Sequence, residues 1–328
     1  MKFQMTRIFC FALTITAMIA SIAPLHAQEK AATPLVPVKM TVTVNVADDK
    51  RMPEVTPQDV FVKKGKERLK VTEWVPARGE RAGLDLFILI DDASDTSLGS
   101  QLAALGAFIN AQVSTTSVGV GYMRNATVQV AQDFTTDHAA AAKALRLPLG
   151  SVGAYGSPYL SVIDLMKRWP ADRNRREVVM VTDGIDRSRA GMGGGMGGGM
   201  GRGFGFSSNP DVDSANDVAM RTGTIIHTIY APGVGRMRRN YWEANNGQMG
   251  ISKLSDVTGG ESFFLGLQSA VSFTPYLEQL QKILDNQYLL TFLTKPEKKA
   301  GLQYVSLSTE LAGVEFAAPD AVWVPAAQ

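Results

Sequence analysis

Acidic and hydroxyl side chains gather directly after a run of large apolar residues at positions 84–90, which is broken only by Asp85. Such a run, closed abruptly by polar residues, is typical of a strand buried on both faces of a parallel sheet. Carboxylate and hydroxyl oxygens are the ligands that Mg²⁺ and Mn²⁺ prefer. The alternative is that these groups only cap a helix beginning at Leu98. The polar cluster consists of Asp91, Asp92, Ser94, Asp95, Thr96 and Ser97.

Two further stretches supply oxygen groups at comparable places. The Gly-rich stretch 149–157 ends in Ser157, and a strand expected at 178–182 is followed at once by Asp183. In a doubly wound α/β fold the ligand site lies at the carboxyl ends of the strands. We therefore expect the three stretches to meet at one edge of a sheet, where their oxygen atoms could hold a divalent cation.

Strand and helix patterns alternate through the middle of the chain, which predicts an α/β fold with a doubly wound, mostly parallel six-stranded sheet. Two of the strands, 118–123 and 127–131, are joined by a short turn and predict a hairpin at a sheet edge. The other expected strands are 84–90, 178–182, 224–230 and 261–265. The expected helices are 98–113, 136–145, 158–169, 212–222, 251–258 and 271–286.

Short β segments flank this region on both sides. Residues 37–78 contain the alternating stretch 38–46 and two more strand candidates, and residues 288–328 contain further short strands. Neither piece is large enough to bury a core alone. We therefore expect both pieces to form one small accessory β domain, with the α/β domain at 83–287 inserted between them. Two separate β additions are the alternative.

The first 27 residues have the parts of a signal peptide. Lys2 and Arg7 precede an apolar run at 8–25, and Ala27 ends a tolerable cleavage site. Residues 28–36 then form a linker rich in Ala and Pro. An uncleaved membrane anchor is the alternative, because the apolar run is close to the lower length limit for a membrane span. We expect an exported bacterial protein that is secreted or periplasmic, or membrane-anchored if the signal is not cleaved.

Charge and cysteine content narrow the function further. The chain has 33 basic and 31 acidic side chains, and two of the basic ones lie in the signal segment, so the remainder is electrically neutral. This balance gives no reason to expect a nucleic-acid partner. The one cysteine, Cys10, also lies in the signal segment. The remainder therefore has no disulfide, catalytic thiolate or zinc–cysteine site.

Five stretches, in this order and spacing, resemble the von Willebrand factor type A (VWFA) domain, in particular an exported bacterial group in which this domain follows a short β unit. The resemblance covers most of the chain, from Val38 to Thr309, and it implies a Rossmann-like α/β domain. The stretches are Leu-Asp-Leu-Phe-Ile-Leu-Ile-Asp at 84–91, Tyr-Gly-Ser-Pro-Tyr-Leu-Ser-Val at 155–162, Val-Val-Met-Val-Thr-Asp-Gly at 178–184, Thr-Gly-Gly-Glu-Ser-Phe-Phe at 258–264 and Asp-Asn-Gln-Tyr-Leu-Leu at 285–290.

The resemblance implies a metal-ion-dependent adhesion site. In that family an Asp-x-Ser-x-Ser element, a Thr and a third-loop Asp hold a divalent cation, and one coordination position is left for a carboxylate of the partner. Read from Asp91, the two serines are replaced by Ala93 and Asp95; read from Asp92, a Ser and a Thr are in place, and this later frame is preferred. The implied ligands are Asp91, Asp92, Ser94, Thr96, Ser157 and Asp183.

The expected cation is Mg²⁺ or Mn²⁺, and the carboxylate-rich first loop also leaves Ca²⁺ open. A degenerate site that binds no metal is the alternative. The expected function is non-enzymatic protein binding at the cell envelope, in adhesion or assembly, with an acidic side chain of the partner completing the metal shell and with no membrane span after signal cleavage. The other candidates are a periplasmic Mg²⁺-dependent hydrolase and a structural module with an inactive metal site.

Signals for an enzyme are poor. Beyond the signal segment there are two histidines, of which His138 falls in an expected helix and His227 is expected to be a satisfied core residue. No Lys or Arg is evident beside Asp183, as phosphoryl transfer would need. The low-complexity stretch 191–206, rich in Gly and Met, is expected to be a flexible loop over the metal face. The residues 237–242, with two arginines and two aromatics, are expected to lie in another loop.

Overall fold

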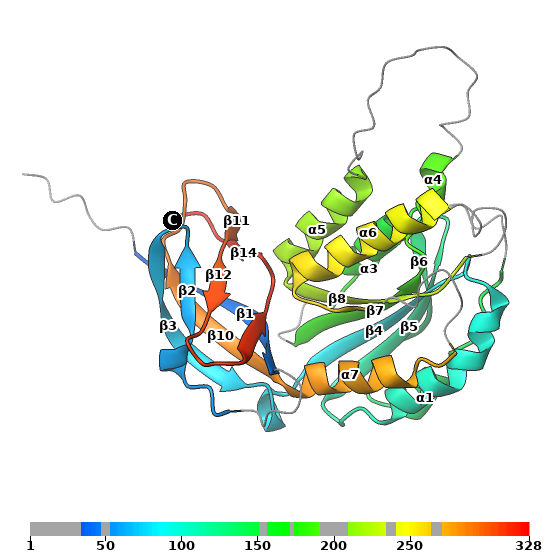
Figure 1. The fold of residues 1–328 in the computed structure, drawn as a ribbon, viewed down its shortest axis with the longest axis horizontal. Coiled ribbons are helices and arrows are strands. Elements are labelled where there is room, and N and C mark those ends of the chain that lie inside the picture. The colour runs from blue at the N-terminus through cyan, green and yellow to red at the C-terminus, as the bar shows by residue number, and fades with distance from the viewer. Residues whose placement is uncertain are drawn as a thin grey trace, which may run out of the picture. The chain divides into compact units, whose positions relative to one another are not determined.

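The computed structural model describes residues 34–46, 53–150, 156–170, 174–190, 209–233, 241–263 and 271–327 (Figure 1). The signal segment, the Gly/Met-rich stretch 191–206 and the residues 237–240 were the subject of predictions, and they lie outside the described residues.

The central sheet is mixed and has the strand order β6-β5-β4-β7-β8-β9. All its pairings are parallel except that of β5 with the edge strand β6. This confirms the predicted doubly wound, mostly parallel six-stranded sheet and its edge hairpin. The strands are β4 (Leu84–Asp91), β5 (Thr116–Arg124), β6 (Thr127–Thr135), β7 (Arg175–Thr182), β8 (Thr224–Tyr230) and β9 (Ser262–Phe263).

Strand β4 lies at the centre of this sheet, and all eight of its residues are buried. Because side chains alternate along a strand, Leu86 and Ile88 pack toward one set of helices, whereas Phe87 and Leu89 pack toward the other. The first set is α1 (Leu102–Asn110), α2 (His138–Lys143) and α7 (Thr274–Asp285); the second is α3 (Pro158–Lys167), α5 (Pro210–Thr222) and α6 (Tyr241–Thr258). The continuous apolar run at 84–90 therefore follows from burial on both faces.

Two helices differ from their expected extent. The helix expected at 98–113 is a 3-10 segment, η3 (Thr96–Gln101), followed by α1. Helix α6 begins at Tyr241, so the expected loop at 237–242 is wrong for its last two residues. The segment after Tyr241 contains Gly247, which lowers helix propensity. A side chain at Gly247 would overlap the backbone oxygen of Asp183. The glycine thus lets helix α6 pack directly against the loop after β7, and this tertiary contact offsets the low helix propensity.

The flanking segments form one β domain. Its larger sheet has the order β12-β2-β3-β10-β1-β13, so it combines strands from both ends of the chain. Strand β10 pairs antiparallel with both β1 and β3, which confirms the predicted accessory domain. The strands are β1 (Val36–Val46), β2 (Phe61–Lys64), β3 (Glu67–Pro76), β10 (Gln287–Thr294), β12 (Ser306–Ser308) and β13 (Val314–Ala317); β11 (Gly301–Tyr304) and β14 (Ala321–Val324) form a separate pair.

The core of the β domain explains why both ends of the chain are needed. Trp74 of β3 stacks on Tyr288 of β10 with ring centroids 4.5 Å apart, and its Nε1 donates to Val55 O at 3.0 Å. The two rings come from segments that the whole α/β domain separates in sequence. The backbone N–H of Ala77, just after β3, donates to Gln287 O at 2.9 Å, so the insertion begins and ends at one point.

Candidate functional site

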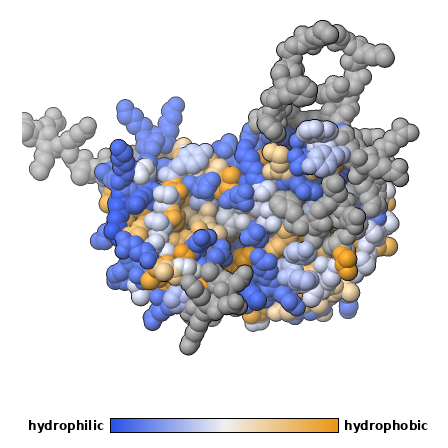
Figure 2. Space-filling model, viewed as in Figure 1, coloured by the Kyte–Doolittle hydropathy of each residue, from blue (hydrophilic) through white to orange (hydrophobic). Residues whose placement is uncertain are grey.

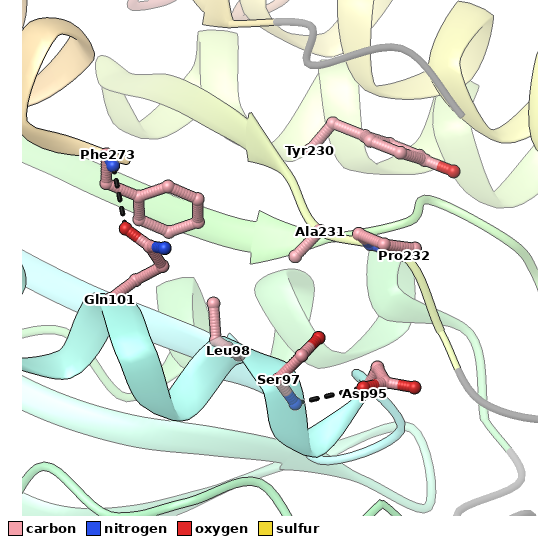
Figure 3. A pocket seen from close by; sticks show the side chains of 8 residues that line it. All are labelled: Asp95, Ser97, Leu98, Gln101, Tyr230, Ala231, Pro232 and Phe273. Carbon is pink, nitrogen blue, oxygen red and sulfur yellow. Dashed lines mark hydrogen bonds between the residues drawn. The ribbon is translucent and has the colours of Figure 1, made fainter. Parts of the chain in front are cut away.

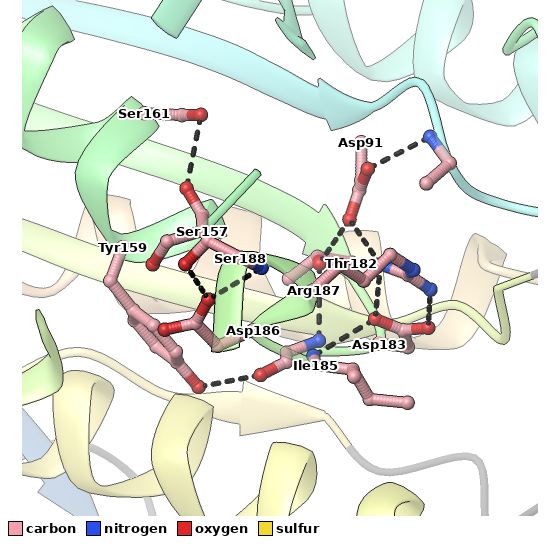
Figure 4. Close-up of polar contacts among 12 residues, drawn as sticks. Asp91, Ser157, Tyr159, Ser161, Thr182, Asp183, Ile185, Asp186, Arg187 and Ser188 are labelled. Carbon is pink, nitrogen blue, oxygen red and sulfur yellow. Dashed lines mark hydrogen bonds and ion pairs between the residues drawn. The ribbon is translucent and has the colours of Figure 1, made fainter. Parts of the chain in front are cut away.

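Two of the predicted ligands, Asp91 and Asp183, lie together at the carboxyl ends of β4 and β7 (Figure 4). Asp91 is the last residue of β4, and its carboxylate is held on both sides. Ala93 N donates to its Oδ1 at 2.8 Å, and Thr182 Oγ1 at the end of β7 donates to its Oδ2 at 2.8 Å. Asp91 is 6% exposed, so this carboxylate is buried with a fixed orientation.

Arg187 is the feature of this site that the sequence did not reveal. It begins the single turn α4 (Arg187–Ala190), four residues after Asp183, and its guanidinium binds that carboxylate with both terminal nitrogens. Its Nη1 also lies 3.7 Å from Asp91 Oδ2. The Arg187 side chain is 6% exposed. A buried positive charge therefore lies between the two carboxylates that are expected to hold a cation.

The burial of this cluster changes its acid–base properties. Burial raises the pKa of Asp183 to about 6, and the charge of Asp91 acts in the same direction, whereas Arg187 and the N–H of Ile185 oppose it. Burial acts to lower the pKa of Arg187, but the carboxylates of Asp183 and Asp91 outweigh it and the pKa lies above its ordinary value. At neutral pH the cluster therefore contains an ionised pair rather than two neutral groups.

Asp92 does not join this cluster. Its carboxylate is fully buried and accepts two hydrogen bonds from Arg146, at 2.7 Å from Nη1 and 2.9 Å from Nη2. The Arg146 guanidinium also lies over the ring of Tyr122, 3.6 Å from its centroid. The geometry thus favours the frame that begins at Asp91, against the frame beginning at Asp92 that we preferred from the sequence.

The hydroxyl residues of the predicted ligand set are divided. Ser94 and Ser157 are buried, and their Oγ atoms have no hydrogen-bond partner in the part of the chain that the structure describes. Thr96 is exposed at the start of η3. A buried hydroxyl without a partner is unusual and needs an explanation. Two of the three predicted hydroxyl ligands, Ser94 and Ser157, are therefore buried without a partner, as expected for a ligand set that no longer holds its cation.

Close packing leaves little space around the ion pair. Gly233, after β8, forms a β-bridge with Ser94, and a methyl group added to it would overlap Arg187 Nη2 and Asp183 Oδ2. Tyr159 of α3 donates its hydroxyl to Gly184 O at 2.9 Å, and burial raises the pKa of this phenol. The backbone of the surrounding loops therefore encloses the Arg187–Asp183 pair.

These residues do not fit a divalent cation in the arrangement seen here. Each of the three predicted carboxylate ligands is near an arginine. Arg187 binds Asp183 and lies 3.7 Å from Asp91, and Arg146 binds Asp92. A cation would have to displace the guanidinium, because both need the oxygen atoms of the same two aspartates. The predicted ligand set stays a prediction, and no chemical step at this site is derived through a metal.

Large apolar side chains are exposed on two segments near the site, the loop after α2 and the first turn of α6. Leu147 and Leu149 are 52% and 49% exposed, and the N–H of Leu149 donates to Asp92 Oδ1 at 3.3 Å. Tyr241 and Trp242 are 61% and 71% exposed at the start of α6, next to Glu243, whose charge acts on Arg187. Figure 2 shows hydrophobic and hydrophilic residues interspersed over the face that it presents. We call Leu147, Leu149, Tyr241 and Trp242 the apolar rim.

A small pocket adjoins the site between η3, the end of β8 and the start of α7 (Figure 3). Gln101 closes it: its Oε1 accepts from Phe273 N at 2.8 Å, and its Nε2 donates to Val271 O at 3.3 Å. The buried amide thereby connects the start of α7 to the loop after β4. Its lining consists of Asp95, Ser97, Leu98, Gln101, Tyr230, Ala231, Pro232 and Phe273.

The histidines lie away from the site. His227 is fully buried in β8, where its Nε2 is 2.9 Å from Glu177 Oε2 and its Nδ1 accepts from Glu261 N at 3.1 Å. These contacts give Nε2 the proton and agree with the satisfied core residue expected from the sequence. His138 Nε2 lies 2.8 Å from the backbone oxygen of Thr116, the first residue of β5.

The sheet order with its antiparallel edge strand, together with the three loops at its carboxyl edge, defines the class of the domain: the α/β part has a von Willebrand factor type A fold. No protein-family model matches the sequence, and no curated protein matches it either.

Solved structures with similar folds come from distant proteins. An aerotolerance-related membrane protein from Bacteroides fragilis NCTC 9343 is 11% identical, with 62% of this chain and 99% of that chain covered and a TM-score of 0.42. BatB from Bacteroides thetaiotaomicron is also 11% identical, with coverages of 61% and 97% and a TM-score of 0.42. Proximal thread matrix protein 1 from the mussel byssus, which has a zinc-occupied MIDAS motif, is 11% identical, with coverages of 65% and 47% and a TM-score of 0.38.

Among the described residues, each helix is either too short or too polar to qualify as a membrane span.

Proposed function

We propose that this protein is an exported, non-enzymatic binding module that holds another protein at the carboxyl edge of its von Willebrand factor type A domain. The observation that carries the proposal is the apolar rim, whose two aromatic and two leucine side chains are 49–71% exposed. Aromatic side chains at the centre of a contact supply much of the energy of protein interfaces. Exposed aromatic and aliphatic side chains near the carboxyl edge of a rigid sheet are typical of a binding face.

The mode of contact follows from the position of Arg187. A partner carboxylate that completes a metal shell needs a cation between Asp91 and Asp183, where the guanidinium lies. We therefore propose contact through the rim, with no cation taking part. Arg146, whose side chain is 42% exposed beside Leu147, offers a positive group to an acidic side chain of the partner.

The position of Asp183 also bears on the alternative of a Mg²⁺-dependent hydrolase. Such an enzyme would use this carboxylate as a metal ligand or a base. Because Arg187 already binds both of its oxygens, the carboxylate is committed to an ion pair. This supports a role in shaping a binding face over a role in turnover.

Site-specific photocrosslinking in cells that export the protein tests the proposal. A photoreactive residue at Trp242 or Leu149 is expected to give an adduct of defined mass. The control is Val113, which is 55% exposed after α1, at the end of the sheet where the strands begin. A partner held by the rim persists when a chelator is added, whereas a metal-completed contact is lost. A structural module without a partner gives no adduct at either rim position, and that result would refute the proposal.

A further inference from the structure

We infer that Arg187 is a built-in replacement for the divalent cation of this site, so that the three loops are held together by a side chain and need no metal. The inference concerns the chain alone and goes beyond the proposed binding function, because it requires no partner.

Arg187 contacts each of the three loops that a cation would join. Its guanidinium binds Asp183 in the third loop and lies 3.7 Å from Asp91 in the first loop. Its backbone N–H donates to Gly156 O in the second loop at 3.3 Å. A bound metal would connect these three loops by taking one or more ligands from each. Arg187 alone makes the same three connections.

The surroundings of the Arg187 guanidinium are closely packed. The guanidinium is almost fully buried, and the backbone of Gly233 lies directly against Arg187 Nη2 and Asp183 Oδ2. A cation at this position and the guanidinium would need the same carboxylate oxygens. Occupation of the site by an ion would therefore require Arg187 to leave it.

Two serine hydroxyls at the site also bear on what occupies it. Ser94 and Ser157 border the site and are buried, and their Oγ atoms are without partners among the residues described. The terminal nitrogens of Arg187 donate to Asp183 and not to these hydroxyls, so the hydroxyl oxygens stay without a partner, whereas a divalent cation would be coordinated by them. Removal of Arg187 would return to the site two carboxylates and two hydroxyls, a set of oxygen ligands suited to Mg²⁺ or Mn²⁺.

The test is thermal unfolding of the purified protein in chelator, in millimolar Mg²⁺ and in millimolar Mn²⁺. The wild-type midpoint is expected to be the same in all three conditions. Arg187→Ala is expected to lower the midpoint in chelator by roughly 10 °C, because it leaves two buried carboxylates unpaired. Addition of Mn²⁺ is expected to recover a large part of that loss.

Arg175→Ala is the matched control. Arg175 is an equally buried arginine at the opposite end of β7, and it also lies near a buried carboxylate, Glu177. Its removal is expected to lower the midpoint by a comparable amount, with no recovery in Mn²⁺. If either variant is unfolded in buffer, the same comparison is made as the yield of refolding from urea with and without Mn²⁺.

Two results would overturn the inference. One is a wild-type midpoint that rises in Mg²⁺ or Mn²⁺, or falls in chelator, since the site would then hold a metal with Arg187 in place. The other is an Arg187→Ala protein that responds to Mn²⁺ no more than Arg175→Ala does. Neither result depends on crosslinking at the rim, so the inference and the proposed binding function can fail separately.

Discussion

One buried arginine, Arg175, begins strand β7, and another, Arg187, follows shortly after the strand ends. The groups that surround the two guanidinium groups differ in charge. Arg175, the first residue of the strand, donates to Ala82 O at 2.9 Å and Leu284 O at 3.5 Å and contacts Gln287 Oε1. Arg187, five residues after the strand ends, binds the carboxylate of Asp183 and lies near that of Asp91. One is held mainly by neutral oxygens and the other by charges.

The difference appears in the acid–base properties of the two side chains. Burial lowers the pKa of Arg175, and the attraction of Glu177 only partly offsets this effect. The pKa of Arg187 is raised, because two nearby carboxylates outweigh the cost of burial. At the edge of the sheet where the strands begin, Arg175 joins the α/β domain to the β domain through Gln287. At the edge where the strands end, Arg187 balances the negative charges of Asp183 and Asp91.

The largest effect that tests this contrast is expected from Arg175→Ala. It would lower the free energy of unfolding by about 3–5 kcal/mol, because Glu177 stays buried without its arginine and several carbonyl oxygens lose a donor. Urea denaturation measures the effect, with Arg176→Ala as the control, whose guanidinium makes an exposed hydrogen bond to Pro170 O. If Arg175→Ala lowers the free energy of unfolding no more than the control does, the contacts of the Arg175 guanidinium contribute little to stability.

A somewhat smaller effect is expected from Asp183→Asn. The substitution keeps the shape of the side chain but leaves Arg187 with Asp91 as its only carboxylate within 4 Å among the described residues, for a loss of about 2–3 kcal/mol. The control is Asp213→Asn, which breaks an exposed pair with Lys253 and should cost less than about 1 kcal/mol. Equal losses in the two variants would contradict the view that the site depends on charge balance.

Glu177→Gln sharpens the contrast from the other side. The expected loss is about 1 kcal/mol, less than for Asp183→Asn, because Arg175 keeps its carbonyl partners and His227 Nε2 can donate to the new amide oxygen. Urea denaturation of the two variants under the same conditions makes the comparison. A larger loss for Glu177→Gln would place the greater dependence on charge at the opposite edge.

The smallest effect on stability is expected from Trp242→Ala. The side chain is 71% exposed, so the free energy of unfolding should change by only about 0.5 kcal/mol. Binding of any partner captured at the rim should nevertheless fall, and equilibrium binding of the purified partner measures that loss. Stable protein with undiminished binding would exclude Trp242 from the interface.

The architecture could be predicted because its signals are local and repeated. The apolar run of β4, the alternation in β1 and the polar groups after β4 and β7 each follow from burial and strand geometry, and together they determine the sheet and the edge that bears the site. The insertion of one domain into the other followed from size alone, since neither β segment could bury Trp74 or Tyr288 unaided.

The charge pairing could be predicted only in part. Arg187 stands four residues after Asp183, a spacing that brings side chains together in a helical turn, so a signal was present in the sequence. Arg146 gave no such signal, because 54 positions separate it from Asp92 and only the fold brings them into contact. The choice between Asp91 and Asp92 likewise depended on which side of the loop each carboxylate faces.

The hydrogen bond from Ala77 N to Gln287 O, which closes the insertion, has a consequence for the order of events during biosynthesis. Strand β1 leaves the ribosome or the export channel first, yet its neighbour β10 follows only after 240 intervening residues, 47–286. The inserted domain can complete its own sheet during that interval. The first strand to be made is then among the last to be paired, and until that moment its open edges are exposed to chaperones and to other copies of the chain.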